Sequence, residues 1–368
     1  MHSHELPLSR GKGNSLGEVS KIPGGIPAYI RSWICVGVLF ALVSCGEKAS
    51  VEPVKLEGAG ATFPVPLYAK WFKDYGRDHS DVQISYDGIG SGGGVKNFVD
   101  HTVDFGASDA AMSEDEMERV DPSLGVQLLP MTASCIVLTY NLPGVSQLKL
   151  SRTAYAGIFL GKITRWNDPV IVKDNASEKL PAMPINLVVR SDTSGTTFAL
   201  TKHLSAVSDA FAASLGVSKM PDWTVGARSK GNDGIANTVQ TTPGSLGYVV
   251  YGSASKQHLP MALLENKSGA FVAASTASGL AALGSALLPD DLIAWVPDPK
   301  AKEAYPIVTY TWMLCYKRYD KKKHDALIGL LDYSLGSGQK DAEPLGYIPL
   351  PAPVIAKVRA ALQTITVS

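Results

Sequence analysis

A chain of 368 residues and 39.0 kDa is too long for one simple core, so two domains of ordinary size are expected. Its 45% hydrophobic and 18% charged residues exclude both a disordered chain and a polytopic membrane protein. The first 45 residues hold four of the 34 basic and two of the 34 acidic side chains, which leaves 30 basic and 32 acidic residues. A nucleic-acid-binding protein would need a clustered basic face, and this charge balance does not favour one.

The N-terminus carries a targeting signal. Arg31 precedes an apolar run over residues 33–43, which is far too short for a transmembrane helix of about 20 residues. The run ends in Leu42-Val43-Ser44-Cys45-Gly46, which resembles the cleavage signal of bacterial lipoproteins. This resemblance implies a signal peptide over residues 1–45 and a lipid anchor on Cys45 in the bacterial cell envelope, periplasmic or at the cell surface. An ordinary signal peptide or a buried strand are the alternatives.

Strand-like and helix-like patterns alternate after a polar tether over residues 47–53. The expected strands are 82–86, 184–190, 246–251 and 307–310, and further strand-like runs cover 134–140 and 311–316. The expected helices contain residues 67–75, 98–99, 112–120, 198–204, 273–288 and 353–367. This alternation predicts an α/β protein with open sheets, in which ligands bind at the carboxyl ends of strands.

Two cysteines remain beyond the signal region. Cys135 and Cys315 each lie in an apolar, strand-like run. Outside the cytoplasm they could form a disulfide, and buried free thiols are the other possibility.

Four separated segments each combine small or hydroxyl-bearing residues with an expected helix start. They are residues 58–63 (GAGATF), 88–94 (GIGSGGG), 104–109 (DFGASD) and 190–196 (RSDTSGT). A helix N-terminus offers free N–H groups and a positive dipole end, so it can bind an anion. Each segment alone also fits a plain loop or a helix cap, with Ser91 as the expected cap of the second. Together they predict one pocket for a small tetrahedral anion.

One arginine accompanies these segments. Arg190 closes an apolar strand, and a helix is expected to start at Ser194-Gly195-Thr196. A guanidinium offers paired donors that match two oxygens of a tetrahedral anion. Asp192 could hold that guanidinium in place, although an arginine at a strand end is often just a solvated surface side chain.

Asp109 is unexpected in an anion pocket, because a carboxylate repels an anion unless the anion has a proton to donate. Phosphate near neutral pH carries such a proton and sulfate does not. Sites built around such a bond reject analogues that lack it by roughly 10⁴–10⁵-fold. Asp109 could instead cap the helix near residues 112–120, but Ser113 and Glu116 already form a capping box for that helix.

At these residues the chain resembles a known family, the phosphate-binding receptor of the high-affinity phosphate ABC importer, among the periplasmic binding proteins. The similarity runs from about Leu56 to the C-terminus and includes residues 58–64, 87–96, 103–110, 160–168, 189–198, 230–236 and 244–249. Carried over by position, the phosphate contacts fall on Thr62, Phe63 (main chain), Ser91, Asp109, Arg190, Ser194, Gly195 and Thr196. Asp192 matches the carboxylate that orients the arginine, and Gly92 stands where the family often has serine.

The resemblance implies a type II periplasmic-binding-protein fold of two α/β lobes, with the ligand in the cleft between them. Lobe I is expected over residues 50–133 and 259–368, and lobe II over residues 134–258. The expected function is a monomeric extracytoplasmic receptor that binds inorganic phosphate and delivers it to a membrane permease. No cofactor, metal or nucleic acid is expected.

Three other functions stay open on the sequence alone. A secreted phosphatase would need a nucleophile with a base or a metal cluster, and the seven histidines show neither arrangement. A receptor for another oxyanion, such as sulfate, molybdate or arsenate, is a nearer alternative. A structural surface lipoprotein that keeps the fold is the third.

Overall fold

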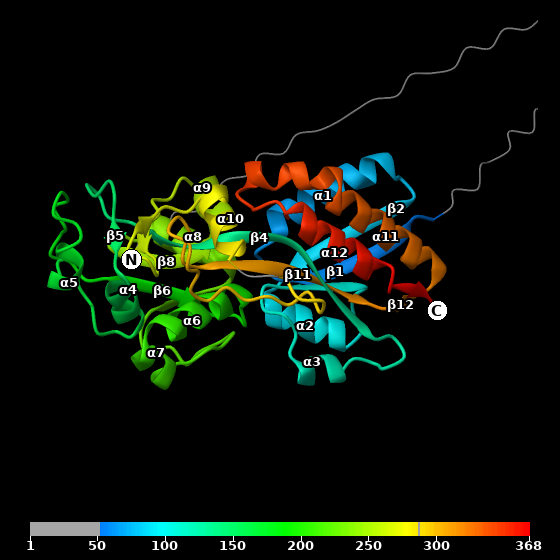
Figure 1. The fold of residues 1–368 in the computed structure, drawn as a ribbon, viewed down its shortest axis with the longest axis horizontal. Coiled ribbons are helices and arrows are strands. Elements are labelled where there is room, and N and C mark those ends of the chain that lie inside the picture. Colours follow the sequence, from blue (N-terminus) through cyan, green and yellow to red (C-terminus); the bar gives the residue numbers. More distant parts are fainter. Residues whose placement is uncertain (1–51, 286–287) are drawn as a thin grey trace, which may run out of the picture. The chain divides into compact units, whose positions relative to one another are not determined.

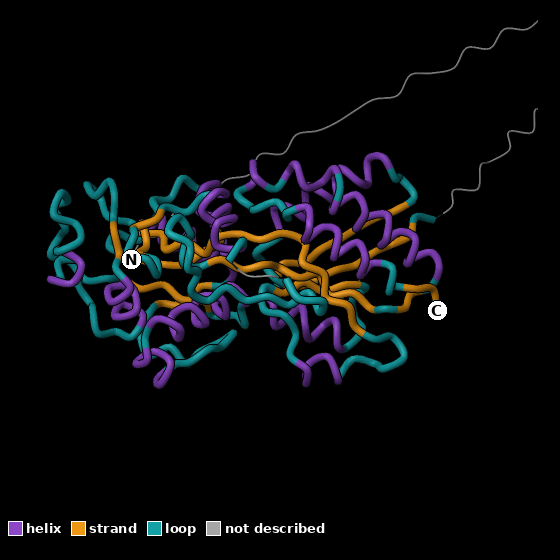
Figure 2. The backbone as a smooth tube through the Cα atoms, in the orientation of Figure 1, coloured by secondary structure: helices purple, strands orange, loops and turns teal. Residues whose placement is uncertain are grey.

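The computed structural model describes residues 52–285 and 288–368 of the chain (Figure 1). The predicted signal peptide and lipidated Cys45 lie outside these described residues. The described residues form one compact unit, in which strands occupy the middle layer and helices cover both sides (Figure 2). Within the described ranges, every helix is too short or too polar to span a bilayer.

The main sheet has eight strands in the order β2-β1-β3-β11-β4-β8-β6-β7. Its strands are β1 Val54–Gly60, β2 Val82–Gly88, β3 Phe105–Ser108, β4 Val126–Tyr140, β6 Asn186–Arg190, β7 Ala227–Ser229, β8 Ser245–Val250 and β11 Val308–Tyr316. Strand β1 pairs in parallel with β2 and β3, and β6 pairs in parallel with β7 and β8. Between these two parallel sets lie β11 and β4, which are antiparallel to their neighbours.

Small sheets and helices complete the fold. The small sheets hold β5 Lys149–Leu150, β9 Leu263–Glu265 and β10 Phe271–Val272, and separately β12 Arg318–Tyr319 and β13 Thr366–Val367. The α-helices are α1 Val65–Asp78, α2 Ser91–Val99, α3 Glu114–Glu118, α4 Arg152–Phe159, α5 Pro169–Val172, α6 Gly195–Val207, α7 Asp209–Ser214, α8 Gly231–Thr241, α9 Tyr251–Lys256, α10 Thr276–Leu283, α11 Lys321–Leu335 and α12 Ala352–Leu362. Short 3₁₀ turns cover Ser337–Asp341 and Glu343–Leu345.

Strand β4 belongs to both halves of the sheet. Its residues 126–135 pair with β11, and its residues 136–140 pair with β8. The long strands β4 and β11 therefore connect the β1–β3 set to the β6–β8 set (Figure 1).

The lobe bounds remain a prediction. The chain is expected to cross from lobe II back into lobe I at residue 259, and two contacts bear on the position of this crossing. Strand β9 pairs in parallel with β5, and Arg152 donates to Asp298 at 2.8 and 3.1 Å. Both contacts join residues of the expected second segment of lobe I to residues of lobe II, which favours a return crossing nearer to β11.

Most of the predicted elements are present, with different ends. The helix expected over residues 273–288 is shorter, because α10 ends at Leu283 before Gly284. The helix expected over 353–367 was too long, since α12 ends at Leu362 and residues 366–367 form an edge strand. The runs expected at 307–310 and 311–316 form one strand, β11, which is buried along its whole length.

The two cysteines are free and buried. In the β4–β11 ladder Cys135 lies opposite Val308, whereas Cys315 lies opposite Gln127. Seven residues of strand separate these positions, or about 23 Å at roughly 3.3 Å per residue. A disulfide needs Cα atoms within about 7 Å, so the free-thiol alternative is confirmed and the disulfide is excluded.

The four candidate anion segments all include the carboxyl ends of parallel strands, namely β1, β2, β3 and β6. The segment 104–109 contains the whole of β3 and does not start a helix, since α3 begins only at Glu114. Close packing brings three of these ends together. Helix α2 lies against β1 and β3 at Gly94, where a Cβ atom would lie 2.8 Å from the carbonyl oxygen of Ala107 and 2.9 Å from that of Ala59. The missing side chain therefore sets how closely Ser91 can approach Asp109.

The contact at Gly94 predicts that Gly94→Ala lowers the free energy of unfolding by about 1–3 kcal/mol, because the new methyl group meets rigid backbone. Gly76→Ala is the matched control in α1, where the nearest atom to a Cβ is 3.9 Å away. It should leave stability unchanged or raise it by up to about 1 kcal/mol. Urea unfolding measures both, and equal stability of the two variants would contradict the prediction.

Candidate anion site

The first part of the site lies between β1 and α1. Phe63 is fully buried, and its carbonyl oxygen accepts a hydrogen bond of 2.6 Å from the Tyr347 hydroxyl. Ala61 donates its N–H to the carbonyl of Ala107 in β3. These bonds fix the backbone on both sides of Thr62, so the start of α1 is held rigidly.

The second part is the start of α2. Ser91 is buried and is the first helical residue, so the expectation that it caps this helix was wrong. The cap is Gly90, whose φ of 95° is a left-handed conformation that favours glycine. A Cβ atom there would also lie 2.5 Å from a carboxylate oxygen of Asp192. Because Ser91 does not cap the helix, its hydroxyl is available to the site, where it accepts from the backbone N–H of Asp109 at 3.2 Å.

The third part is the buried arginine. Arg190 is 2% exposed, and its Nε and Nη2 atoms donate to Asp192, the former at 2.7 Å. Burial alone would raise the pKa of Asp192, but the hydrogen bond and charge of Arg190 lower it below its ordinary value. The remaining nitrogen, Nη1, is buried and has no hydrogen-bond partner among the described residues. A buried guanidinium nitrogen without a partner is costly, so it marks a place for an acceptor.

The fourth part is the start of α6. The helix starts at Gly195, as expected, and Ser194 caps it by accepting from the N–H of Thr197 at 3.1 Å. A Cβ atom at Gly195 would lie 2.5 Å from the Ser91 hydroxyl oxygen and 2.8 Å from the Asp109 nitrogen. Thr196 donates to the Asp109 carboxylate at 3.2 Å. The start of α6 therefore touches both the β3 end and the α2 start.

Asp109 lies at the meeting point of these parts and is 1% exposed. Its carboxylate accepts from Thr311 at 2.9 Å as well as from Thr196. Burial raises its pKa to about 7, although the bonds from Thr311 and Thr196 and the charge of Arg190 act in the opposite direction.

Ser113 and Glu116 form the capping box of α3, with bonds of 3.2 and 3.0 Å. Asp109 is therefore not the cap of that helix, as the sequence analysis predicted.

The structure thus brings together all the predicted site residues: Thr62, Phe63, Ser91, Asp109, Arg190, Asp192, Ser194, Gly195 and Thr196. Only two of these side chains, Arg190 and Asp192, form an ion pair with each other. The donors around them are hydroxyl and backbone N–H groups, so the site can bind an anion with little net positive charge.

Sequence reasoning missed three neighbours of the site. Thr311 binds Asp109, but its position in an apolar strand gave no sign of that contact. Tyr248 accepts from the N–H of Arg190 at 3.2 Å and bonds to Thr197 at 2.7 Å. Asn232 bonds to Thr62 and lies within the motif 230–236 that the sequence analysis singled out without assigning it a role.

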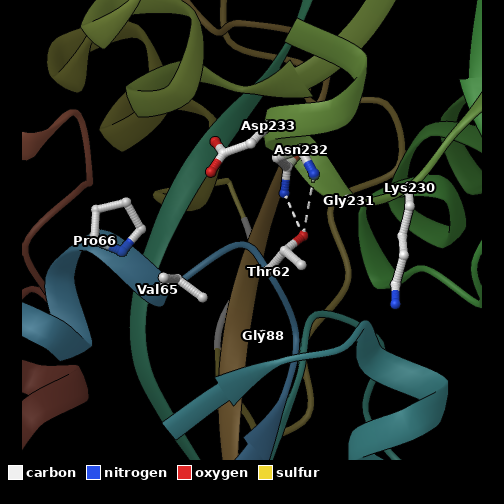
Figure 3. A pocket seen from close by; sticks show the side chains of 8 residues that line it. All are labelled: Thr62, Val65, Pro66, Gly88, Lys230, Gly231, Asn232 and Asp233. Atoms are coloured by element: carbon white, nitrogen blue, oxygen red, sulfur yellow. Dashed lines mark hydrogen bonds between the residues drawn. The ribbon is translucent and has the colours of Figure 1, made fainter. Parts of the chain in front are cut away.

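A cavity of about 310 Å³ opens beside Thr62 (Figure 3). It is lined by Thr62, Val65, Pro66, Gly88, Lys230, Gly231, Asn232 and Asp233. The described part of the chain holds no group of three or more His, Cys, Asp or Glu side chains suited to a metal ion.

Comparison with known structures defines the class of protein. The family described as "PBP superfamily domain" matches residues 47–337. A high-affinity periplasmic phosphate-binding protein solved with phosphate (PfluDING) superposes with a TM-score of 0.68 at 22% identity, over 83% of this chain and 93% of that chain. The phosphate-binding protein of Stenotrophomonas maltophilia gives a TM-score of 0.67 at 23% identity with the same coverage. The fold is therefore the two-lobed type II fold of periplasmic binding proteins, as predicted.

Sequence relatives narrow this class. The phosphate-binding protein PstS of Pasteurella multocida is 36% identical over 334 residues, which cover 89% of this chain and 95% of that protein. PstS of Methanocaldococcus jannaschii is 36% identical over 345 residues, which cover 87% of this chain and 88% of that protein. The chain belongs to the PstS family of phosphate-binding proteins.

The raised pKa of Asp109 predicts a pH-dependent stability of the anion-free protein. Between about pH 4 and about pH 7 the unfolded chain loses this proton while the folded chain keeps it. The contribution of Asp109 to the free energy of unfolding is therefore full below about pH 4. It is lost progressively as the pH rises from about 4 through about 7, by up to roughly 4 kcal/mol in all.

Asp109→Asn removes this titration, so the variant should gain stability relative to the wild type as the pH rises. Urea unfolding of both proteins from about pH 5 to about pH 8 in anion-free buffer measures the difference. A difference that stays constant over this range would mean that Asp109 is ionised throughout.

Proposed function

We propose that this chain is an extracytoplasmic receptor that binds one inorganic phosphate in the cleft between its lobes. It delivers the phosphate to the membrane permease of an ABC importer. The observation that carries the proposal is the buried Nη1 of Arg190, which has no partner among the described residues although Asp192 holds the other two nitrogens. In this proposal the phosphate ligands are the residues that the sequence analysis predicted: Thr62, Phe63, Ser91, Asp109, Arg190, Ser194, Gly195 and Thr196.

Asp109 discriminates between anions through its proton. Above a pH of about 7 its carboxylate is ionised and accepts a hydrogen bond from the proton that phosphate carries. Sulfate has no such proton and would place an acceptor against an acceptor. Below a pH of about 7 the protonated carboxyl can donate to sulfate, so selectivity weakens as the pH falls.

Contacts between the two predicted lobes support closure around the ligand. Gly92 donates its N–H to the carbonyl of Thr193 at 2.9 Å, and Lys219 pairs with Glu116 at 2.7 Å. Closure buries the anion among fixed dipoles and removes its water, which strengthens each hydrogen bond to it.

The remaining features of the proposal follow from the sequence. Lobe I begins with residues 50–133 and lobe II starts at residue 134. The β5–β9 pairing favours a return to lobe I closer to β11 than the residue 259 expected from the sequence. Cys45 carries the lipid anchor to the cell envelope, and the receptor acts as a monomer.

The receptor performs no catalysis. In the described chain the side-chain hydrogen bonds of the histidines go to backbone carbonyls, Tyr155 and Asp325, and none joins a histidine ring to a serine hydroxyl. A serine nucleophile with a histidine base therefore has no support here.

Calorimetric titration of residues 46–368, stripped of bound anion, tests this function. We expect one phosphate site and a preference over sulfate of roughly 10⁴-fold at about pH 8. If sulfate binds only when Asp109 is protonated, and the pKa of Asp109 is about 7, sulfate affinity should rise about tenfold between pH 8 and pH 6. Asp109→Asn should shrink the preference and remove the pH dependence of sulfate affinity, since an amide can donate to sulfate at either pH.

Sulfate binding as strong as phosphate binding at pH 8 would make the protein a general oxyanion receptor. The absence of heat with both anions would favour a structural role for the fold.

Substitution of the arginine tests the centre of the site. Arg190→Ala should weaken phosphate binding at least tenfold, because the anion loses its one cationic donor. Arg190→Lys keeps a charge beside the buried Asp192 and should bind with intermediate affinity, since lysine lacks the planar donor pair. Arg77→Ala, at a side chain that is 69% exposed on α1, is the control and should bind as the wild type. An unchanged dissociation constant in Arg190→Ala would place the anion elsewhere.

A further inference from the structure

We propose that Asn232 sets the direction of the Thr62 hydroxyl hydrogen and thereby makes Thr62 a donor to the bound anion. Asn232 is a positioning residue in this proposal, which rests on the proposed phosphate-binding function. No contact between Asn232 and the anion is needed.

The geometry of the two residues is fixed from both sides. Asn232 lies in the first turn of α8 and is 1% exposed. Its side-chain Nδ2 donates to Thr62 Oγ1 at 2.9 Å, and its backbone N–H donates to the same oxygen at 3.3 Å (Figure 3). Its Oδ1 accepts from the N–H of Val250 at 3.1 Å. Because Oδ1 is engaged in this way, the amide must present its donor end to Thr62.

A threonine hydroxyl has one hydrogen to donate and two lone pairs to accept with. Asn232 supplies two donors to Thr62 Oγ1, so both lone pairs are occupied. The hydroxyl hydrogen must then point away from Asn232 and find an acceptor elsewhere. The deprotonated oxygens of an anion are acceptors, so the arrangement leaves Thr62 with the polarity that such a ligand needs.

The turn that starts α8 also holds Arg190 in place, through Asp192. Gly231 donates its N–H to Asp192 at 3.0 Å, and Asp192 holds Arg190. Gly231 has a φ of 70°, and a Cβ atom there would lie 3.3 Å from the Thr62 methyl group. Glycine thus lets the start of α8 approach Thr62 closely while it holds Asp192 in place.

This contact also depends on closure. Thr62 follows β1, whereas Asn232 belongs to the α8 helix beside β8 and β6, in the other parallel set of the sheet. The hydroxyl is therefore oriented only when the two sets of elements are together. Separation of the lobes would release Thr62 to rotate, which lowers its contribution to binding at the moment of ligand release.

A double-mutant cycle on phosphate affinity tests this proposal in the full chain. Asn232→Ala should weaken phosphate binding about tenfold in the wild type and by less than about twofold in a Thr62→Val background, where no hydroxyl remains to orient. In a Thr62→Ser background, which keeps the hydroxyl, the effect of Asn232→Ala should return to about tenfold. Asn237→Ala, at an exposed position of the same helix, is the control and should bind as the wild type.

Equal losses from Asn232→Ala in the wild type and in the Thr62→Val background would show a structural role only and would overturn the proposal. If Asn232→Ala does not fold, Asn232→Asp keeps the acceptor for Val250 but would draw the Thr62 hydrogen toward itself. That variant should lose at least as much affinity, and wild-type affinity in it would also overturn the proposal. Failure of the wild type to bind phosphate would instead refute the proposed function itself.

Discussion

The burial of one guanidinium is the constraint on which the rest of the site depends. The guanidinium of Arg190 is buried, so each of its nitrogens needs a hydrogen-bond partner in a space that excludes water. Asp192 satisfies two of them, and Asp192 is itself held by the start of α8. The third nitrogen, Nη1, has no partner among the described residues, and a bound anion would supply the missing acceptor. Removal of either Arg190 or Asp192 would leave the other as an unpaired buried charge, typically at a cost of about 3–5 kcal/mol.

The balance of charge around this pair is the basis of the proposed selectivity. Asp109 adds a second carboxyl group, but its raised pKa lets it carry a proton or a charge near neutral pH. In the proposed phosphate site, one shared proton decides whether Asp109 attracts or repels the ligand. In the same proposal, neutral donors at the starts of α1, α2 and α6 would supply the remaining bonds to the anion without adding charge.

The sequence indicated which residues come together better than it indicated where the helices and strands end. Arg190, Asp109 and Ser194 were identifiable because each lies in a dense local pattern of small and polar residues. The cap of α2 was wrong because Gly90 takes a left-handed conformation that neighbouring serine and glycine residues do not reveal. The role of Thr311 could not be predicted, since its contact with Asp109 joins residues about 200 positions apart and depends on the register of the strands. The C-terminal helix was predicted too long, because residues 366–367 pair with the edge strand β12 and do not continue the helix.

The shared strand β4 has a consequence for how the molecule unfolds. Its 15 residues pair with β11 over one part and with β8 over the next, without a break in the strand. Melting either half of the sheet would strip β4 of partners on one part and loosen the register of the other. The two halves should therefore lose structure in a single cooperative transition, and the amide hydrogens of β4 should be among the last to exchange with solvent.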